Sequence, residues 1–408
     1  MSENKDIAVL RELVKEYLDI CHRPEQKRLR QLWRKHNSLE KTRPLIIVRG
    51  GVAFREEIPE IYERECEDPF FQSFERILRD SIYKAGLGDD RVFEPWLTLR
   101  ASYKCTGWGV EIARNHAEEQ GGSFKVDYPI KEEDDLEKLR EPWHEIDEEQ
   151  TRNRYERLAD AVGDLIPVAV DRAPAYRTWS ADLSTDLGYL RGIENFMLDM
   201  SDRPEWLHRL VGFLQEGVLR THRQAEEAGD WNLNAHQNQS MPYADELEDP
   251  APDVDGVDRS RLWYFAAAQE FALVGPEKHD EFLLQYQIPI MEEFGLTAYG
   301  CCEDLTNKID ILRQIPNLRR IAVTPWADVP KCAEAIGEDY VISWRPSPER
   351  MVCSGFDEDR VRSITRDALE ACRGLHVDIS LKDIQTVQNE PERLRKWVQI
   401  TRDVAEDV

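Results

Sequence analysis

The chain has 408 residues, with 54 Lys and Arg against 80 Asp and Glu, a formal net charge of −26 at pH 7. This acidic excess repels nucleic acid and anionic membrane surfaces, so neither is expected as a partner. No run reaches the roughly 18 apolar residues that span a bilayer. The charged N-terminal segment lacks the apolar core of a secretory signal. The eight cysteines include no Cys-x-x-Cys pair, which favours reduced thiols in the cytoplasm.

The N-terminal part of the chain predicts a helical extension over residues 1–43. It contains two amphipathic stretches, IAVLRELVKEYLDI and RLRQLWRKH, which favour helices packed outside the main domain. The apolar run PLIIVRG begins at Pro44 and ends in glycine, as a buried strand does. A helix is expected near Phe70 to Ala85, and a second strand within RVFEPWLTLRASY. One further domain therefore covers residues 44–408.

From about Leu165 onward, short apolar runs alternate with longer helical patterns. Such alternation predicts an α/β protein with a parallel sheet. At least six units follow one another without a Gly-x-Gly-x-x-Gly fingerprint, which favours a closed (β/α)₈ barrel over an open dinucleotide-binding sheet. The expected strands include LIPVAVDR, WNLNAHQ, LTAYGCC, LRRIAVTP, DYVISWRP and LHVDISLKD.

The second half of the chain resembles a known family. The stretch LRGIENFMLDMSDRPEWLHRLVGFL, the register of Pro276, Phe282, Pro289 and Gly295, and the stretch AEAIGEDYVISWRPSP carry the likeness. Together they resemble the uroporphyrinogen decarboxylase superfamily, which includes the decarboxylase and the zinc-dependent methyltransferases that serve corrinoid proteins. The resemblance implies a (β/α)₈ barrel, and barrels of this superfamily are often homodimers.

The chain departs from both active sites of that superfamily. The decarboxylase binds substrate carboxylates through an Arg-Gln-Ala-Gly-Arg-Tyr motif, whereas the comparable region here offers Arg49 without that motif. The methyltransferases hold zinc through a His-x-Cys motif and a cysteine on the last strand. Here Cys302 matches the motif's cysteine, Gly300 replaces its histidine, and the last-strand position falls near Ser380.

The sharpest local feature is the run of Cys301, Cys302 and Glu303 at the carboxyl end of a predicted strand. Catalytic groups of (β/α)₈ barrels gather at this face, and thiolates with carboxylates suit zinc. The structural alternative is a buried cysteine beside acids that stabilise the next helix. His236, just past another expected strand, is a further candidate ligand or a hydrogen-bonded structural group. Because strand side chains alternate, Cys302 is expected to face the pocket and Cys301 the helices.

Other strand ends add charged and aromatic candidates. A lysine that follows the last strand can bind an anion or act as an acid, and a Trp-Arg pair can stack on and bind one. We therefore expect the catalytic groups Cys301, Glu303, Lys382 and Asp383, the metal ligands His236 and Cys302, and the substrate-binding residues Arg49, Trp326, Trp344 and Arg345.

Three functions are compatible with these residues. The first is a metal-dependent methyltransferase that acts on a small methylated compound or a corrinoid partner protein, with Zn²⁺ at the thiols. The second is a decarboxylase or lyase of an acidic, tetrapyrrole-like substrate, whose carboxylates Arg345 and Lys382 bind. The third is a non-catalytic accessory barrel. Bound metal separates the first from the second.

Overall fold

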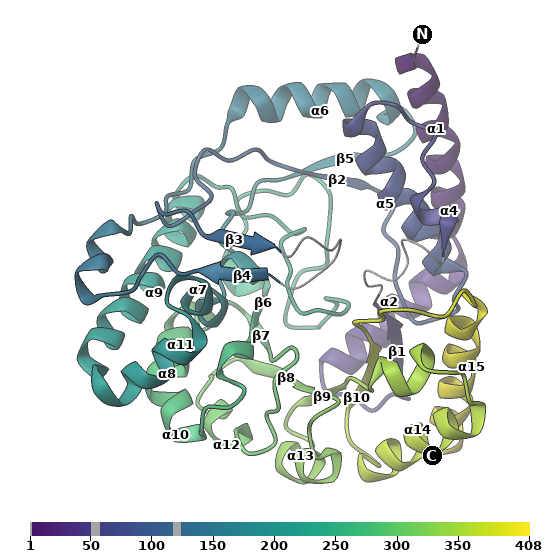
Figure 1. Ribbon diagram of the computed structural model, residues 1–408. Coiled ribbons are helices and arrows are strands. Elements are labelled where there is room, and N and C mark those ends of the chain that lie inside the picture. The colour runs from purple at the N-terminus through teal and green to yellow at the C-terminus, as the bar shows by residue number, and fades with distance from the viewer. Residues whose placement is uncertain (1, 50–57, 117–123) are drawn as a thin grey trace.

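Two parallel sheets form the centre of the protein in a computed structural model that describes residues 2–49, 58–116 and 124–408 (Figure 1). The larger sheet has six strands in the order β1-β10-β9-β8-β7-β6, and the smaller sheet pairs β2 with β5. The strands are β1 (Leu45–Val48), β2 (Leu97–Arg100), β5 (Val168–Asp171), β6 (Trp263–Ala266), β7 (Leu296–Tyr299), β8 (Leu318–Val323), β9 (Val341–Trp344) and β10 (Val377–Leu381).

Apolar composition explains why these short segments form a buried sheet. Every residue of β1, β6, β7, β9 and β10 is buried, as expected where helices cover a parallel sheet. Every strand pair of the two sheets is parallel, so the carboxyl ends of the six strands lie along one edge. The loops that follow these strands therefore approach one another, although they lie far apart in the sequence.

Helices surround the sheets (Figure 1). The helix from Pro276 to Met291 continues through a π-helical turn, η5 (Asp280–Leu284). None of the helices in the described ranges is long and apolar enough to cross a membrane. The helices are α1 (Ser2–Cys21), α2 (Pro24–Asn37), α4 (Pro59–Tyr62), α5 (Pro69–Ala85), α6 (Glu148–Val162), α7 (Leu183–Leu190), α8 (Ile193–Asp202), α9 (Pro204–Glu227), α10 (Pro276–His279), α11 (Gln285–Met291), α12 (Ile309–Leu312), α13 (Val329–Ile336), α14 (Glu358–Ala371) and α15 (Glu392–Asp407).

The α/β class is confirmed, but the strands of the described chain do not pair into a closed ring. Sheet pairing stops between β1 and β2 and between β5 and β6. The expected strand WNLNAHQ forms only a bridge between Asn232 and Asp255. Its asparagine side chains take up hydrogen bonds locally, for example from Asn234 N to Asn232 Oδ1 at 3.0 Å. The antiparallel pair β3 (Ala113–His116) and β4 (Phe124–Asp127) was not expected from the sequence.

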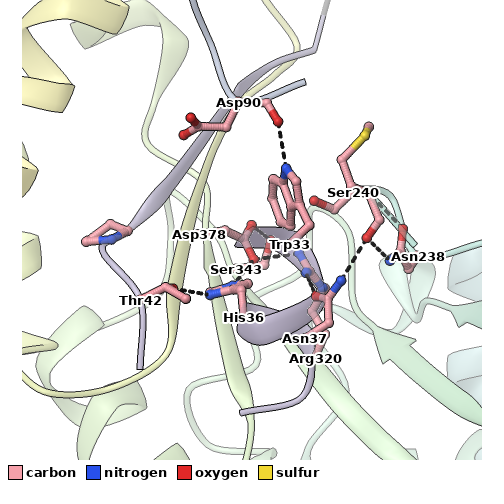
Figure 2. Close-up of polar contacts among 12 residues, drawn as sticks. Trp33, His36, Asn37, Thr42, Asp90, Asn238, Ser240, Arg320, Ser343 and Asp378 are labelled. Atoms are coloured by element: carbon pink, nitrogen blue, oxygen red, sulfur yellow. Dashed lines mark hydrogen bonds and ion pairs between the residues drawn. The ribbon is translucent and has the colours of Figure 1, made fainter. Parts of the chain in front are cut away.

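The two expected N-terminal helices are present and have different neighbours. Helix α1 packs on α5 and α6. Helix α2 lies near the amino ends of β1, β8 and β10, where the fully buried Trp33 donates a hydrogen bond from its indole to the carbonyl of Asp90 at 2.6 Å (Figure 2). Helix α2 therefore covers the amino ends of these strands. The loops that form the candidate site lie at the opposite, carboxyl ends.

A buried ion pair anchors α2 to the sheet (Figure 2). Arg320 on β8 lies 2.5 Å from Asp378 on β10 and donates a second hydrogen bond to the side chain of Asn37 at 2.7 Å. Ser343 donates to the other oxygen of Asp378 at 2.9 Å. Burial by itself raises the pKa of Asp378, but Arg320 and the hydrogen bonds lower it below its ordinary value, so the carboxylate stays charged.

We predict that Arg320→Met lowers the free energy of unfolding by about 3–5 kcal/mol, because it leaves the buried Asp378 carboxylate without its partner. Denaturant titration measures this change. Arg313→Met is the matched control, since Arg313 pairs with Asp339 at the surface and its loss costs about 0–1 kcal/mol. Equal effects of the two substitutions would contradict the anchoring role of the buried pair.

Candidate functional site

The candidate site is a cavity of about 330 Å³ at the carboxyl edge of the larger sheet. Three strand ends contribute to it, through Arg49 after β1, the cysteine pair after β7 and Lys382 after β10. Its lining is Arg49, Trp179, Gln239, Gln269, Cys301, Cys302, Lys382 and Asp383.

Gly300 turns the chain at the end of β7 and so sets the position of the cysteines. The strand ends at Tyr299, and Gly300 has φ +96°, a conformation that L side chains rarely adopt. A Cβ at this position would lie 2.6 Å from Leu305 Cδ1 and 3.0 Å from Ala322 Cβ. Both the backbone angle and the available space therefore require glycine here.

The side chain of Glu303 holds the loop of Cys301 and Cys302 in place through backbone hydrogen bonds. Its carboxylate is buried and accepts hydrogen bonds from the backbone N–H groups of Cys301 at 2.8 Å, Cys302 at 2.9 Å and Ala268 at 2.7 Å. Three N–H donors occupy both oxygens, so Glu303 does not face the cavity as a free acid or base. Its position supports a role in holding the thiols in place.

The two thiols lie side by side, which differs from the alternation expected for a strand. The sulfur atoms of Cys301 and Cys302 are 3.6 Å apart. Both residues follow Gly300 and belong to a turn, where the strand rule of opposite faces does not apply. Cys301 is buried and Cys302 is exposed, but both line the cavity, so Cys301 does not turn away toward the helices as the alternation predicted.

The ammonium of Lys382 contacts both sulfur atoms. Its Nζ lies 3.3 Å from Cys301 Sγ, 3.0 Å from Cys302 Sγ and 2.7 Å from the Asp383 carboxylate. Burial lowers the pKa of Lys382, but Cys301 and Asp383 raise it to a net value above the ordinary one. The lysine therefore stays charged at neutral pH.

The surroundings favour a thiolate at Cys301. A hydrogen bond from the Cys302 thiol, together with the positive charges of Arg345 and Lys382, lowers the pKa of Cys301 to about 6, although burial opposes the shift. The same hydrogen bond and burial raise the pKa of Cys302. At pH 7 the pair therefore holds one proton, on Cys302, and Cys301 is the thiol that ionises first.

Two arginines contribute positive charge near Cys301. Arg49 donates a hydrogen bond to the Gln239 side chain at 2.8 Å and lines the cavity. Burial and the charge of Arg345 lower the pKa of Arg49 to about 10, which still leaves it positively charged at pH 7. Arg345 donates to the Cys301 carbonyl and is almost fully buried, so it supports the loop.

Three expected site residues lie elsewhere. His236 accepts a hydrogen bond from the backbone N–H of Trp263 at 3.2 Å, at the start of β6, and burial lowers its pKa to about 4. Trp326 is 78% exposed beyond β8, and Trp344 is buried against a separate cavity beside α13 and α14. The structure thus brings five of the expected residues together at the cavity: Arg49, Cys301, Cys302, Lys382 and Asp383. Glu303 and Arg345 contact the backbone of the cysteine loop instead.

The sequence did not point to Trp179, Gln239 or Gln269. Trp179 follows β5, a predicted strand, and could have been found by inspecting the residues after it. Gln269 follows β6, a strand that the sequence did not predict, so that rule does not reach it. Gln239 comes two residues after the expected strand WNLNAHQ, so the same inspection would have found it, although that segment forms only a bridge.

The donor set does not fit the expected zinc site. The part of the chain that the structure describes contains no group of three or more His, Cys, Asp and Glu that could hold a metal ion. The Lys382 ammonium, a donor without a lone pair, lies within hydrogen-bond distance of both sulfurs, where a metal would compete with it.

Comparisons with known proteins identify the fold. No family model and no curated protein matches the chain. A solved structure of a methyltransferase from Methanosarcina mazei is similar, with 14% identity over 92% of this chain and 98% of that chain, at a TM-score of 0.52. At this identity the likeness shows the fold alone, which is a methyltransferase-like α/β fold.

We predict that the Cys301 thiolate titrates near pH 6 and that Cys302→Ala moves the midpoint upward by about one unit or more, because the largest stabilising hydrogen bond is lost. Ultraviolet thiolate absorbance against pH measures the midpoint. The buried Cys353 is the control, and its replacement by alanine should leave the midpoint in place. An unchanged midpoint in Cys302→Ala would show that the sulfurs do not share a proton.

Proposed function

We propose that the protein is a methyltransferase-like enzyme in which the Cys301 thiolate attacks the methyl group of a small anionic compound. The observation that carries the proposal is the Lys382 ammonium 3.3 and 3.0 Å from the two sulfurs, in a cavity that Arg49 also lines. The similarity to a methyltransferase supports the class of reaction. The eight parallel strands of the two sheets also favour a (β/α)₈ barrel, opened at two places, of the uroporphyrinogen decarboxylase superfamily.

The transfer is a displacement at carbon. The Cys301 sulfur forms a bond to the methyl carbon while the bond from that carbon to the substrate's heteroatom breaks, and the electron pair leaves with the heteroatom. Lys382 donates a proton to the heteroatom and later regains one from water. Arg49 offsets the negative charge that develops on the leaving heteroatom beside the thiolate cavity.

The methyl group must leave Cys301 before a second turnover. A corrinoid carried by a partner protein is the acceptor that we propose, as the family resemblance implies. No step here passes through zinc, because Lys382 contacts the sulfurs that would bind it.

A second candidate function is a carboxy-lyase, and the two cavity cations Arg49 and Lys382 favour it because they suit a carboxylate substrate. The two functions differ in what they require of Cys301. A lyase that only binds carboxylates keeps its activity in Cys301→Ser, whereas the methyl transfer proposed here loses it.

We predict that iodoacetate alkylates Cys301 faster than neutral iodoacetamide does, because the cavity cations attract the anionic reagent. Alkyl transfer from iodoacetate forms the carbon–sulfur bond and releases iodide, as the proposed reaction does with its own leaving group. Mass spectrometry of the labelled peptide at successive times gives both rates. Arg49→Gln should lower the iodoacetate rate about tenfold, on the order of one charge interaction in a partly buried site, and leave the iodoacetamide rate nearly unchanged.

The matched control is Arg366→Gln, at an exposed position of α14 away from the cavity. It should alter neither rate. Slow labelling of Cys301 by both reagents at pH 7 would refute the thiolate nucleophile. Equal rates for the two reagents would refute the anionic substrate.

A further inference from the structure

A second and larger cavity adjoins the thiolate cavity. Its volume is about 800 Å³, within the range of roughly 300–1,000 Å³ that small-molecule sites occupy. Trp179 and Gln269 line both cavities, so they form the boundary between them. A ligand held in the larger cavity can therefore extend one end toward Cys301.

Aromatic side chains from three segments form much of the larger cavity's wall. Tyr103 and Trp108 come from the segment after β2, Tyr176 and Trp179 from the loop after β5, and Tyr189 from α7. Trp108 and Tyr176 already pack edge to face, with ring centroids 5.5 Å apart. Flat rings stack against or meet the edges of such side chains, so this wall favours a planar aromatic ligand.

Two arginines add positive charge at the exposed side of this cavity. The guanidinium of Arg100 lies 5.5 Å from the ring centre of Tyr103, and that of Arg114 lies 4.9 Å from the ring centre of Tyr189. Within the described ranges neither arginine has an ion-pair partner, although the chain has 80 acidic residues. Arginines in such positions are available to bind an anion.

The acidic groups of the cavity offset this positive charge only in part. Burial raises the pKa of Asp186 to about 8, so its carboxyl group is uncharged at neutral pH. Glu270 accepts hydrogen bonds from the hydroxyl groups of Ser184 and Thr185. Among the side chains that line the cavity, two arginines therefore face one carboxylate, Glu270, and the balance of charge is positive.

We propose that the larger cavity binds a planar aromatic anion, with its ring against Trp179 and Tyr189 and its negative group at Arg100 and Arg114. The inference deepens the proposed function and rests on it for one point, that the ring is the body of the substrate whose methyl group reaches Cys301. Binding itself needs no chemistry at the thiol.

Calorimetry on the Cys301→Ser chain tests binding without alkyl transfer. The probe is naphthoate, and two matched compounds define its recognition: decahydronaphthoate keeps the charge without the planar ring, and naphthamide keeps the ring without the charge. Naphthoate should bind roughly tenfold more tightly than either, the size of one aromatic contact or one exposed charge pair. Equal affinities for naphthoate and decahydronaphthoate would overturn the proposal that the cavity recognises a planar ring. Equal affinities for naphthoate and naphthamide would overturn the proposal that it recognises a negative charge.

Substitutions locate the binding in this cavity. Trp179→Leu and Arg114→Gln should each weaken naphthoate binding about fivefold or more. Trp143→Leu is the matched control, because Trp143 is 44% exposed, as Trp179 is at 42%, and does not line the cavity. Unchanged affinity in Trp179→Leu would overturn the inference.

The two proposals can fail separately. If naphthoate does not bind while iodoacetate still labels Cys301 rapidly, the aromatic site is refuted and the thiolate nucleophile stands. If naphthoate binds while Cys301 resists labelling, the aromatic site stands and the methyl transfer falls.

Discussion

The contact between the Lys382 ammonium and two adjacent sulfurs is the interaction on which the candidate site depends. A buried thiolate is stable only beside compensating charge or hydrogen bonds. The hydrogen bond from Cys302 contributes most, and Arg345 and Lys382 supply the positive charge. Without them, burial would keep Cys301 protonated and unreactive.

Backbone geometry then decides which residues can share the site. Parallel pairing places the ends of β1, β7 and β10 at one edge, and this unites Arg49, Cys301 and Lys382. The opposite edge is held by α2 and by the buried pair of Arg320 and Asp378. The amino edge of the larger sheet thus carries stabilising contacts, while loops at its carboxyl edge form the cavities. This division is typical of parallel α/β folds.

The sequence predicted the parallel strands other than β6, and it pointed to five of the eight residues that line the thiolate cavity, because a residue directly after a strand must lie at the carboxyl edge. It placed Trp344 in the site although this is the last residue of β9, whose side chain packs against the helices. Its neighbour Arg345 points to the Cys301 loop instead. His236 was misplaced because its segment forms no strand, and nothing local in the sequence reveals that. The side-by-side cysteines depend on the turn at Gly300, which strand alternation does not anticipate.

The role of Lys382 can be tested by metal content more directly than by any activity. Protein purified without oxygen should contain no stoichiometric zinc, and Lys382→Met should raise the pH at which the Cys301 thiolate forms, because the lysine and not a metal stabilises it. Elemental analysis of the wild type and of Cys301→Ser gives the answer. About one zinc per chain in the wild type, lost in Cys301→Ser, would contradict the account and return the site to a metal-dependent methyltransferase.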